Sequence, residues 1–299
     1  MGSHSWALRL QLQDMSAAPP VVLTVAGFDP SSGAGVTADI KTIAAHECYG
    51  VSCITALTVQ STRGVRRLQP VASDIILETL EELIADLEVM AVHIGMLGTG
   101  GTVRALANFF RQNKLPHIVL DPILKSSSGA DLLDAEGTKA LIDELLPLAE
   151  VLTPNLDEAA VLASVAVTNL DEMRAAAARL HSLGAPNVVV TGGQLEKAID
   201  LLSFTAAGKP EEEVFTAQRQ RSTSTHGTGC AFATALACHL AHGRGLPEAV
   251  LLSKAYVSSA IAKAQVVGKG TGPLHHLFRM EYPRRVNPII SDPEWGRSK

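Results

Sequence analysis

The stretch Val21-Val22-Leu23-Thr24-Val25-Ala26-Gly27-Phe28-Asp29-Pro30-Ser31-Ser32-Gly33-Ala34-Gly35 decides the fold. Its first six residues form a β-branched, apolar run that predicts a buried strand. The residues from Gly27 onward are dense in turn formers and predict a loop, and a helix is expected from about Val36 to His46. A strand, a glycine-rich loop and a helix in this order are typical of a ligand-binding unit at the carboxyl edge of a parallel sheet.

The same alternation of strands and helices continues along the chain. Two strand-like segments, Asp200–Phe204 and Val214–Gln218, flank a Gly-Lys-Pro turn and predict an antiparallel hairpin at the edge of the sheet. The pattern predicts an α/β fold, a three-layer sandwich with a mostly parallel central sheet, helices on both faces and a small antiparallel edge hairpin. Further strands are expected at 52–59, 91–96, 117–122, 150–155 and 187–193, and helices at 73–87, 99–112, 135–146, 170–183, 231–240 and 246–264.

No linker is long enough to divide the chain into two domains. We therefore expect a single domain over residues 18–280, preceded by a flexible N-terminal tail, 1–17, and followed by a peripheral C-terminal tail, 281–299.

Composition excludes several classes of protein. The 299 residues carry a formal net charge of −5, unlike the basic surface of a nucleic-acid binder. No run reaches about 18 apolar residues, so a membrane span is not expected. The four cysteines form no Cys-x-x-Cys pair and no zinc-binding spacing, which fits a reducing cytoplasm.

A second glycine-rich loop, Ser224-Thr225-His226-Gly227-Thr228-Gly229-Cys230-Ala231, precedes an apolar run that ends at Leu240. Gly227 and Gly229 allow a sharp backbone turn, and the Thr228 hydroxyl is expected to cap the helix. Free N–H groups at the helix start would then bind a phosphate or an oxyanion. The same field would lower the pKa of the Cys230 thiol. The structural alternative makes Cys230 a small core residue.

Three other residues are candidates for substrate contacts. Gln60 offers a donor and an acceptor at a strand end, which suits a flat heterocycle with an adjacent ring nitrogen and amino group. The alternative for Gln60 is a solvated loop residue. Met96 could line a ring pocket or belong to the core. Asp39 could contact a ligand, although the helix dipole alone favours an acid in a first turn.

Acidic residues also follow two of the expected strands. Asp121 ends the strand 117–122, and acids at the carboxyl ends of parallel strands face the cleft. Asn155-Leu156-Asp157-Glu158 has the spacing of a capping box, with Asn155 as the cap and Glu158 three residues later. That spacing is fully explained by helix capping.

Together these loops resemble the hydroxymethylpyrimidine/phosphomethylpyrimidine kinase family of the ribokinase-like superfamily. The resemblance covers roughly residues 21 to 278. It implies two ATP-dependent phosphorylations, first of the hydroxymethyl group of 4-amino-5-hydroxymethyl-2-methylpyrimidine and then of the monophosphate, in thiamine biosynthesis. The motifs that carry it are Val25–Gly35, Ala38–Thr42, Tyr49-Gly50, Ile54–Leu57, Gln60-Ser61-Thr62, Gly64-Val65, Ile94–Leu97, Leu120-Asp121-Pro122, Thr153-Pro154-Asn155 with Glu158, Thr225–Cys230 and Val267–Pro273.

The resemblance also implies roles for individual residues. Cys230 would be the base, beside Gly227 and Gly229 of the anion site, and Asp121 and Glu158 would face Mg²⁺. A homodimer is implied as well. The substrate would be bound by Gly27, Ala34, Asp39, Gln60, Met96 and Ile123, and ATP by Asn155, Glu158, Thr191, Gly192, Thr228 and Lys269.

One departure from the family pattern affects the substrate. Family members often carry Lys-Gly-Gly-His where this chain has Thr191-Gly192-Gly193-Gln194. A threonine offers only a hydroxyl to phosphate, so the second phosphorylation is the less certain step. The related pyridoxal kinases can carry Thr-Gly-Gly here, which makes pyridoxal kinase the enzymatic alternative. A ligand-binding sensor that has lost catalysis is the alternative from another class.

Overall fold

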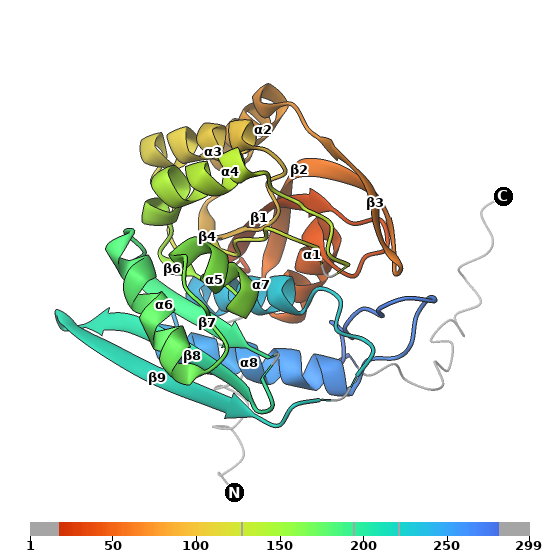
Figure 1. Ribbon diagram of the computed structural model, residues 1–299. Helices are drawn as coiled ribbons and strands as arrows, with labels where there is room; N and C mark the ends of the chain where they lie inside the picture. The colour runs from red at the N-terminus through yellow and green to blue at the C-terminus, as the bar shows by residue number, and fades with distance from the viewer. Residues whose placement is uncertain (1–17, 127, 194, 221, 281–299) are drawn as a thin grey trace, which may run out of the picture.

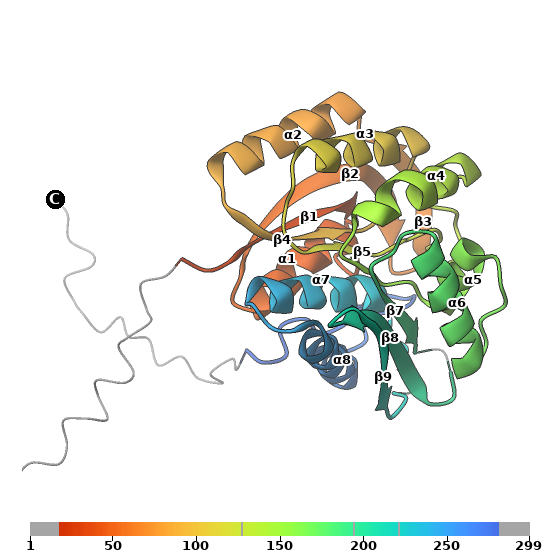
Figure 2. The same cartoon turned by 90° about the vertical axis from the view of Figure 1, so that its left-hand side faces the viewer.

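The computed structural model describes residues 18–126, 128–193, 195–220 and 222–280. Within them a nine-stranded sheet lies between two layers of helices (Figures 1 and 2). The expected three-layer α/β sandwich is therefore confirmed. The two expected tails, 1–17 and 281–299, fall outside the described residues.

The sheet is parallel in its centre and antiparallel at both ends. Its strands lie in the order β3-β2-β1-β4-β5-β6-β7-β8-β9. All neighbours from β2 to β7 are parallel, whereas the pairs β2–β3, β7–β8 and β8–β9 are antiparallel. The strands are Val21–Phe28 (β1), Tyr49–Ser61 (β2), Gly64–Pro70 (β3), Val89–Ile94 (β4), Ile118–Leu120 (β5), Val151–Leu152 (β6), Asn187–Gly192 (β7), Ala198–Ala206 (β8) and Lys209–Ala217 (β9).

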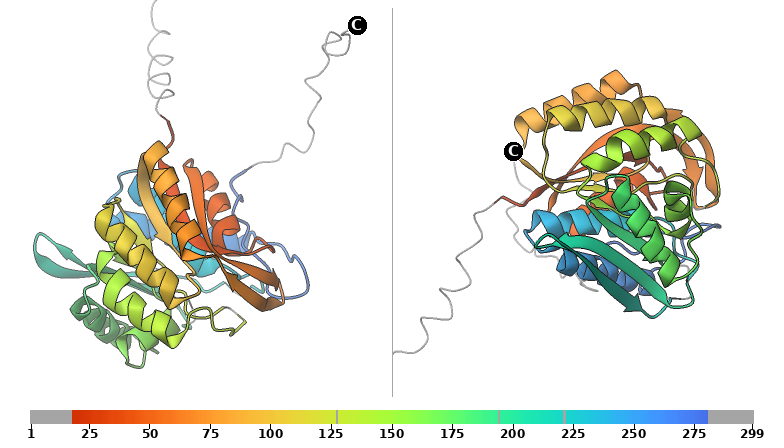
Figure 3. Two further views of the ribbon diagram at one scale, coloured as in Figure 1. Left: turned by 90° about the horizontal axis from the view of Figure 1, so that it is seen from above. Right: turned by 60° about the vertical axis from the view of Figure 1, so that its left-hand side comes forward.

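Helices cover both faces of the sheet, which explains why β1 is apolar except for the buried Thr24. Val22 packs into the core under α1, α7 and α8, whereas Leu23 and Val25 pack into the core on the side of α2 to α6 (Figure 3). A strand buried on both faces cannot alternate with polar residues. The helices are Gly35–Ala45 (α1), Ser73–Asp86 (α2), Gly100–Gln112 (α3), Ala135–Ala140 (α4), Leu156–Ala163 (α5), Leu170–Ser182 (α6), Thr228–Ala241 (α7) and Leu246–Ala262 (α8).

Several elements differ from the sequence-based expectation. The β8–β9 hairpin is confirmed but is longer than expected. Strand β3 was not predicted, because it pairs only with β2 at the sheet edge and buries little apolar surface. The helix expected at 135–146 is α4 followed by a π-helical turn, Leu141–Leu145, and a 3₁₀ turn, Leu146–Leu148.

Helix α7 is the innermost helix of the fold. Twelve of its residues are buried, on every side of the helix, because it packs between the sheet and α1 and α8. An apolar helix of this kind belongs to the core of a large domain. Among the described residues, no helix has the length and apolar character that crossing a membrane requires.

Candidate active site

The loops at the carboxyl edge of the sheet enclose one long cleft of about 2200 Å³. This volume exceeds the roughly 300–1000 Å³ typical of a site for a single small ligand, so two ligands can bind side by side. The cleft is lined by most of the expected site residues, namely Gly27, Ala34, Gln60, Met96, Asp121, Ile123, Asn155, Glu158, Thr191, Gly227, Thr228, Gly229 and Cys230. Three expected residues, Asp39, Gly192 and Lys269, do not line it.

The start of α7 borders the cleft and is a candidate for binding an anion. Gly227 is the N-cap residue and has a φ of 80°, and a Cβ there would lie 1.9 Å from the Gly33 carbonyl oxygen. Only glycine fits this position. The N–H groups of Thr228, Gly229 and Cys230 belong to the first helical turn, which has no intrahelical acceptors for them. Together with the helix dipole they favour a phosphate at this end of the cleft.

Thr228 does not cap α7 as expected. It is the first helical residue, and its hydroxyl donates to the Thr225 carbonyl oxygen over 2.7 Å. The N-cap residue is Gly227, which has no side-chain acceptor. Its left-handed backbone conformation turns the chain into the helix. The first-turn N–H groups are therefore left for a ligand rather than for Thr228.

The expectation of a lowered thiol pKa at Cys230 is wrong. Burial raises the pKa of Cys230 well above its ordinary value, and the nearby carboxylates of Asp121 and Asp39 raise it further. The residue is only 8% exposed although it borders the cleft. Desolvation and negative charge outweigh the helix dipole here, so Cys230 carries a neutral thiol.

Two buried acids face the cleft next to this helix start. Asp121 follows β5, and its Oδ2 is buried without a hydrogen-bond partner among the described residues. Burial raises the pKa of Asp121 to about 6, an effect that His93 partly offsets. Burial and the charge of Asp121 raise the pKa of Glu158 well above its ordinary value. Two unneutralised carboxyl groups in one place favour a cation.

The predicted capping box is confirmed at the start of α5. The Asn155 side chain accepts from the Glu158 N–H over 3.0 Å, and Glu158 Oε2 accepts from the Asn155 N–H over 2.9 Å. The box leaves Glu158 one carboxylate oxygen for another partner. Within the described ranges no group of three or more His, Cys, Asp or Glu side chains could hold a metal alone. Mg²⁺ is commonly held by one or two carboxylates together with substrate phosphates and water.

The opposite end of the cleft is an apolar pocket with one amide. Met96 packs with Ala56, Leu132 and Ile123. A Cβ on Gly27 would lie 1.9 Å from the Met96 Cε, so glycine gives the methionine room. These residues line the cleft together with the Gln60 side chain.

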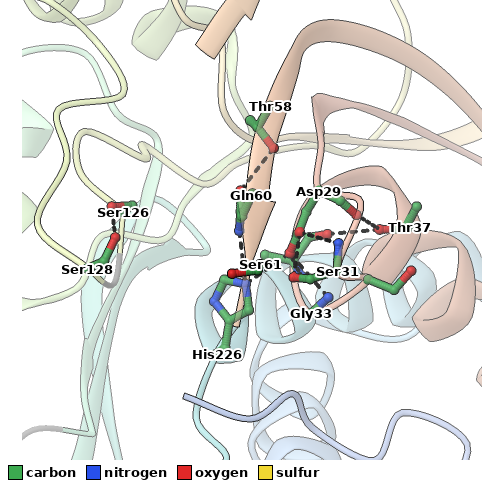
Figure 4. Close-up of polar contacts among 12 residues, drawn as sticks. Asp29, Ser31, Gly33, Thr37, Thr58, Gln60, Ser61, Ser126, Ser128 and His226 are labelled. Carbon is green, nitrogen blue, oxygen red and sulfur yellow. Dashed lines mark hydrogen bonds and ion pairs between the residues drawn. The ribbon is translucent and has the colours of Figure 1, made fainter. Parts of the chain in front are cut away.

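Sequence reasoning missed two polar residues at this end, Asp29 and His226. His226 Nε2 lies 2.9 Å from Asp29 Oδ2 and 3.2 Å from Gln60 Nε2 (Figure 4). Asp29 also accepts from the Ser31 N–H and hydroxyl. These bonds lower the pKa of Asp29 despite its burial, which alone would raise it. No local spacing pairs residues 197 positions apart, so only the fold reveals this contact.

Asp39 lies inside the protein rather than at the substrate. It is fully buried, accepts hydroxyl hydrogen bonds from Thr24 (2.7 Å) and Thr234 (2.9 Å), and lies 3.3 Å from His93 Nδ1. Burial lowers the pKa of His93, but the charge of Asp39 outweighs this and raises it. Because α1 begins at Gly35, Asp39 lies beyond the first turn where it was expected, and its carboxylate links β1, β4 and α7 inside the core.

Gly192 and Lys269 also lie away from the cleft. The Gly192 N–H donates to Asp200 Oδ1 (3.0 Å), and Asp200 Oδ2 accepts from Lys254 Nζ (2.7 Å). This buried ion pair borders the cleft near Thr191 and was not foreseen. Lys269 has an exposed side chain, and its backbone N–H donates to the Thr62 hydroxyl over 3.3 Å.

The loop that contains Lys269 packs against two segments that border the cleft. Gly272 accepts from the His226 N–H (3.1 Å) and donates to the Thr223 carbonyl (3.0 Å). Gly270 donates to the Thr62 hydroxyl (3.2 Å), and a Cβ on it would lie 1.9 Å from the Thr62 carbonyl oxygen. The end of the described chain thus packs against both the β2–β3 turn and the loop before α7.

The fold and this site are those of a ribokinase-like small-molecule kinase. The model of the phosphomethylpyrimidine kinase family matches residues 29–275. A hydroxymethylpyrimidine/phosphomethylpyrimidine kinase of Rhizobium meliloti is 40% identical over 266 residues, which are 87% of this chain and 97% of that protein. The chain therefore belongs to the phosphomethylpyrimidine kinase family.

The chain is also similar to a longer bifunctional protein and to two solved kinase structures. A thiamine biosynthesis bifunctional protein of Geobacter sulfurreducens is 40% identical over 87% of this chain, which spans only 53% of that longer relative. A Bacillus subtilis pyridoxal kinase, solved with ADP, superimposes with a TM-score of 0.78 at 32% identity, covering 87% of this chain and 98% of the other. A phosphomethylpyrimidine kinase of Clostridium difficile gives 0.70 at 33% identity, covering 81% and 99%.

Proposed function

We propose that the protein transfers phosphate from ATP to the hydroxymethyl group of 4-amino-5-hydroxymethyl-2-methylpyrimidine, and then phosphorylates the monophosphate to the diphosphate. The observation that carries this proposal is the arrangement of the cleft. An apolar pocket with the Gln60 amide lies at one end, and the N-terminus of α7 lies between it and the acids Asp121 and Glu158. A flat aminopyrimidine and a nucleoside triphosphate therefore fit in the cleft with their reacting ends facing each other.

Each group of residues has a separate task in this reaction. Gly27, Ala34, Met96 and Ile123 enclose the ring, and Gln60 binds its amino edge. The N–H groups of residues 227–230 hold the transferring phosphate, where negative charge accumulates. Asn155, Thr191 and Thr228 contact the nucleotide. A loose transition state for phosphoryl transfer asks more for positioning and charge neutralisation than for a strong base.

Asp121 and Glu158 fit Mg²⁺ at the phosphate end. When bound there, the metal would neutralise negative charge on the phosphates. The two carboxyl groups supply oxygen ligands, and their raised pKa values report a site that lacks positive charge. Cys230 lies beside them as a neutral thiol, and it could accept the hydroxyl proton only as a thiolate, after its own proton has left for solvent as bound cations make its surroundings less negative.

Pyridoxal kinase is the second candidate, and Thr191 favours it. Thr191 lines the cleft where many family members have a lysine, so the second phosphate meets a hydroxyl instead of a cation. The B. subtilis relative and a Staphylococcus aureus pyridoxal kinase solved with AMP-PCP and pyridoxal (TM-score 0.77, 31% identity, covering 87% of this chain and 94% of the other) share the fold. Gln60 favours the pyrimidine, because pyridoxal has no amino group next to its ring nitrogen.

One assay distinguishes these functions. We would measure kcat/KM for the hydroxymethylpyrimidine, its monophosphate and pyridoxal with Mg-ATP, in parallel. Efficient turnover of both pyrimidines supports the two-step function. Faster turnover of pyridoxal contradicts the substrate assignment but leaves the phosphate site in place. ATP turnover that never depends on any of the three would favour the sensor.

We further propose that residues 18–280 act as one kinase domain, in the cytoplasm, as a homodimer that binds neither nucleic acid nor membranes. The four free cysteines and the net charge of −5 support this setting. Size-exclusion chromatography with light scattering tests the dimer.

A further inference from the structure

One histidine connects two parts of the substrate pocket. His226 comes from the loop before α7, Asp29 from the loop after β1, and Gln60 from the end of β2 (Figure 4). The single nitrogen Nε2 of His226 contacts both partners, at 2.9 Å from Asp29 Oδ2 and 3.2 Å from Gln60 Nε2. The ring rests on Gly33, where a Cβ would lie 2.2 Å from the His226 Cδ2. The histidine is therefore held in position.

Asp29 determines which nitrogen of His226 carries the proton. Its carboxylate already accepts from the Ser31 N–H (2.8 Å), the Ser31 hydroxyl (2.6 Å), the Gly33 N–H (3.2 Å) and the Ala34 N–H (2.9 Å). A carboxylate in such a cradle is ionised and only accepts hydrogen bonds. His226 Nε2 must then carry a hydrogen and donate it, since a lone pair would face a negative oxygen at 2.9 Å.

The donor on His226 in turn determines how the Gln60 amide must lie. With the amide nitrogen toward His226, as in Figure 4, two N–H donors would face each other. The Thr58 hydroxyl would also need two hydrogens, because it lies 2.9 Å from the Phe28 carbonyl and 3.1 Å from Gln60 Oε1. Rotating the amide by half a turn exchanges two atoms of similar size and resolves both conflicts.

After this rotation every group has a partner. His226 Nε2–H donates to Gln60 Oε1 as well as to Asp29, and Gln60 Nε2 donates to the Thr58 hydroxyl. Thr58 gives its one hydrogen to the Phe28 carbonyl. The amide still has one hydrogen and one lone pair for a ligand, because Gln60 lines the cleft.

We propose that His226 is a positioning residue that fixes the Gln60 amide in one orientation, and that this orientation makes the pocket selective for an aminopyrimidine edge. This inference rests on the proposed function of the site. The amide hydrogen near Thr58 is offered to an acceptor ring nitrogen, and the amide oxygen near His226 to the neighbouring amino group. A pyrimidin-4-one of the same shape presents a ring N–H and a carbonyl, the reverse pattern, and is rejected.

The test compares the aminopyrimidine alcohol with its 4-oxo analogue. Binding of each is measured by titration calorimetry without ATP, for wild type and for His226→Leu. We expect wild type to prefer the aminopyrimidine about 100-fold or more, because a mismatched donor or acceptor is left unpaired. His226→Leu frees the amide to rotate, so the preference falls about tenfold or more while KM for ATP stays within about twofold.

Two further variants separate positioning from general packing. His226→Gln keeps an N–H donor and should recover part of the lost preference. Ser31→Ala removes a donor from Asp29 but leaves the histidine, and should retain the wild-type preference. A His226→Leu variant that binds both compounds more weakly by the same factor, with the preference unchanged, overturns the inference.

A measurement on the unaltered protein guards against a variant that fails to fold. Long-range ¹H–¹⁵N NMR of ¹⁵N-histidine-labelled protein reports the tautomer of His226 directly. A hydrogen on Nε2 is expected, and a neutral ring with its hydrogen on Nδ1 overturns the inference. Selective binding without any turnover of the aminopyrimidine would remove the proposed function and leave the amide orientation standing.

Discussion

The acidic side chains at the two ends of the cleft have opposite environments, one rich in hydrogen-bond donors and one poor in them. Asp29, at the ring pocket, is surrounded by donors from its own loop and by His226. Asp121, at the phosphate end, has a buried oxygen without a partner among the described residues, and its pKa is raised to about 6. The pKa of Asp29 is instead lowered.

This difference indicates a division of labour. The polar side chains of the ring pocket already have their hydrogen-bond partners without a ligand. Little conformational entropy is therefore lost when the substrate binds. The phosphate end is incomplete and holds unneutralised charge, which a bound cation stabilises. Mutations at the two ends should therefore change different quantities.

The largest expected effect follows from removing the charge of Asp121. Asp121→Asn should lower kcat by about 10³-fold, because charge neutralisation dominates phosphoryl transfer. The KM for the pyrimidine should stay within about threefold. Steady-state kinetics at saturating Mg-ATP provide the measurement. Asp171→Asn, which removes an exposed acid that does not line the cleft, is the control. An Asp121→Asn enzyme with near-normal kcat would show that this end does not act through charge.

The second largest expected effect is on substrate binding in the ring pocket. Gln60→Ala should lower kcat/KM for the aminopyrimidine by about 100-fold, mainly through KM, because two hydrogen bonds to the ring are lost. The KM for ATP should not change. A Met96→Leu variant of similar volume serves as a control for packing. If kcat fell and KM did not, Gln60 would act on the chemical step.

Replacing Cys230 should lower activity less than replacing Asp121 or Gln60. Its thiol is neutral and buried, so Cys230→Ala is expected to reduce kcat by only about 10- to 30-fold. Rapid-quench measurements of the chemical step with bound substrate test this. If kcat remained near normal with substrate still bound in order, Cys230 would have no role as proton acceptor.

The smallest effects concern stability, and they should have opposite signs. Asp29 has a lowered pKa, so it stabilises the fold above its ordinary value of 3.8 and loses this contribution as the pH falls below it. Asp121 has a raised pKa, so it destabilises the fold at pH 7, and stability returns as the pH falls from about 6 toward 3.8.

Urea unfolding at pH 7 and pH 4.5 measures both contributions. Asp29→Asn should lower the free energy of unfolding at pH 7 by roughly 1 kcal/mol, through lost hydrogen bonds. Asp121→Asn should raise it at pH 7 by roughly 1–2 kcal/mol and by less at pH 4.5. Two variants that shift stability in the same direction would contradict the contrast between the two ends.

The sequence predicted those parts of the site that depend on local spacing. The capping box of Asn155 and Glu158 depends only on residues close together in the sequence. The same is true of the glycines at the start of α7. Asp29 and His226 were missed because their contact depends on how β1 and α7 meet. Asp39 was placed at the substrate because its sequence position cannot show that its side of α1 faces α7.

The same reasoning explains the elements that were not foreseen. Strand β3 carries Arg66 and Arg67 and lies at an edge, so it has no buried face to impose an apolar pattern. The Asp200–Lys254 pair joins β8 to α8 across 54 positions. Contacts between distant elements are the part of a site that periodicity alone does not encode.

The loop at residues 268–272 has a consequence for how the protein is made. Thr62 accepts hydrogen bonds from the N–H groups of Lys269 and Gly270, and the His226 N–H donates to the Gly272 carbonyl. At a ribosome speed of about 5–20 residues per second, roughly 10–40 s separate Thr62 from Gly272. The β2–β3 turn therefore emerges long before the segment that covers it. A chain stalled before Gly272 contains every strand of the sheet but lacks the hydrogen bond that joins this segment to the loop before α7.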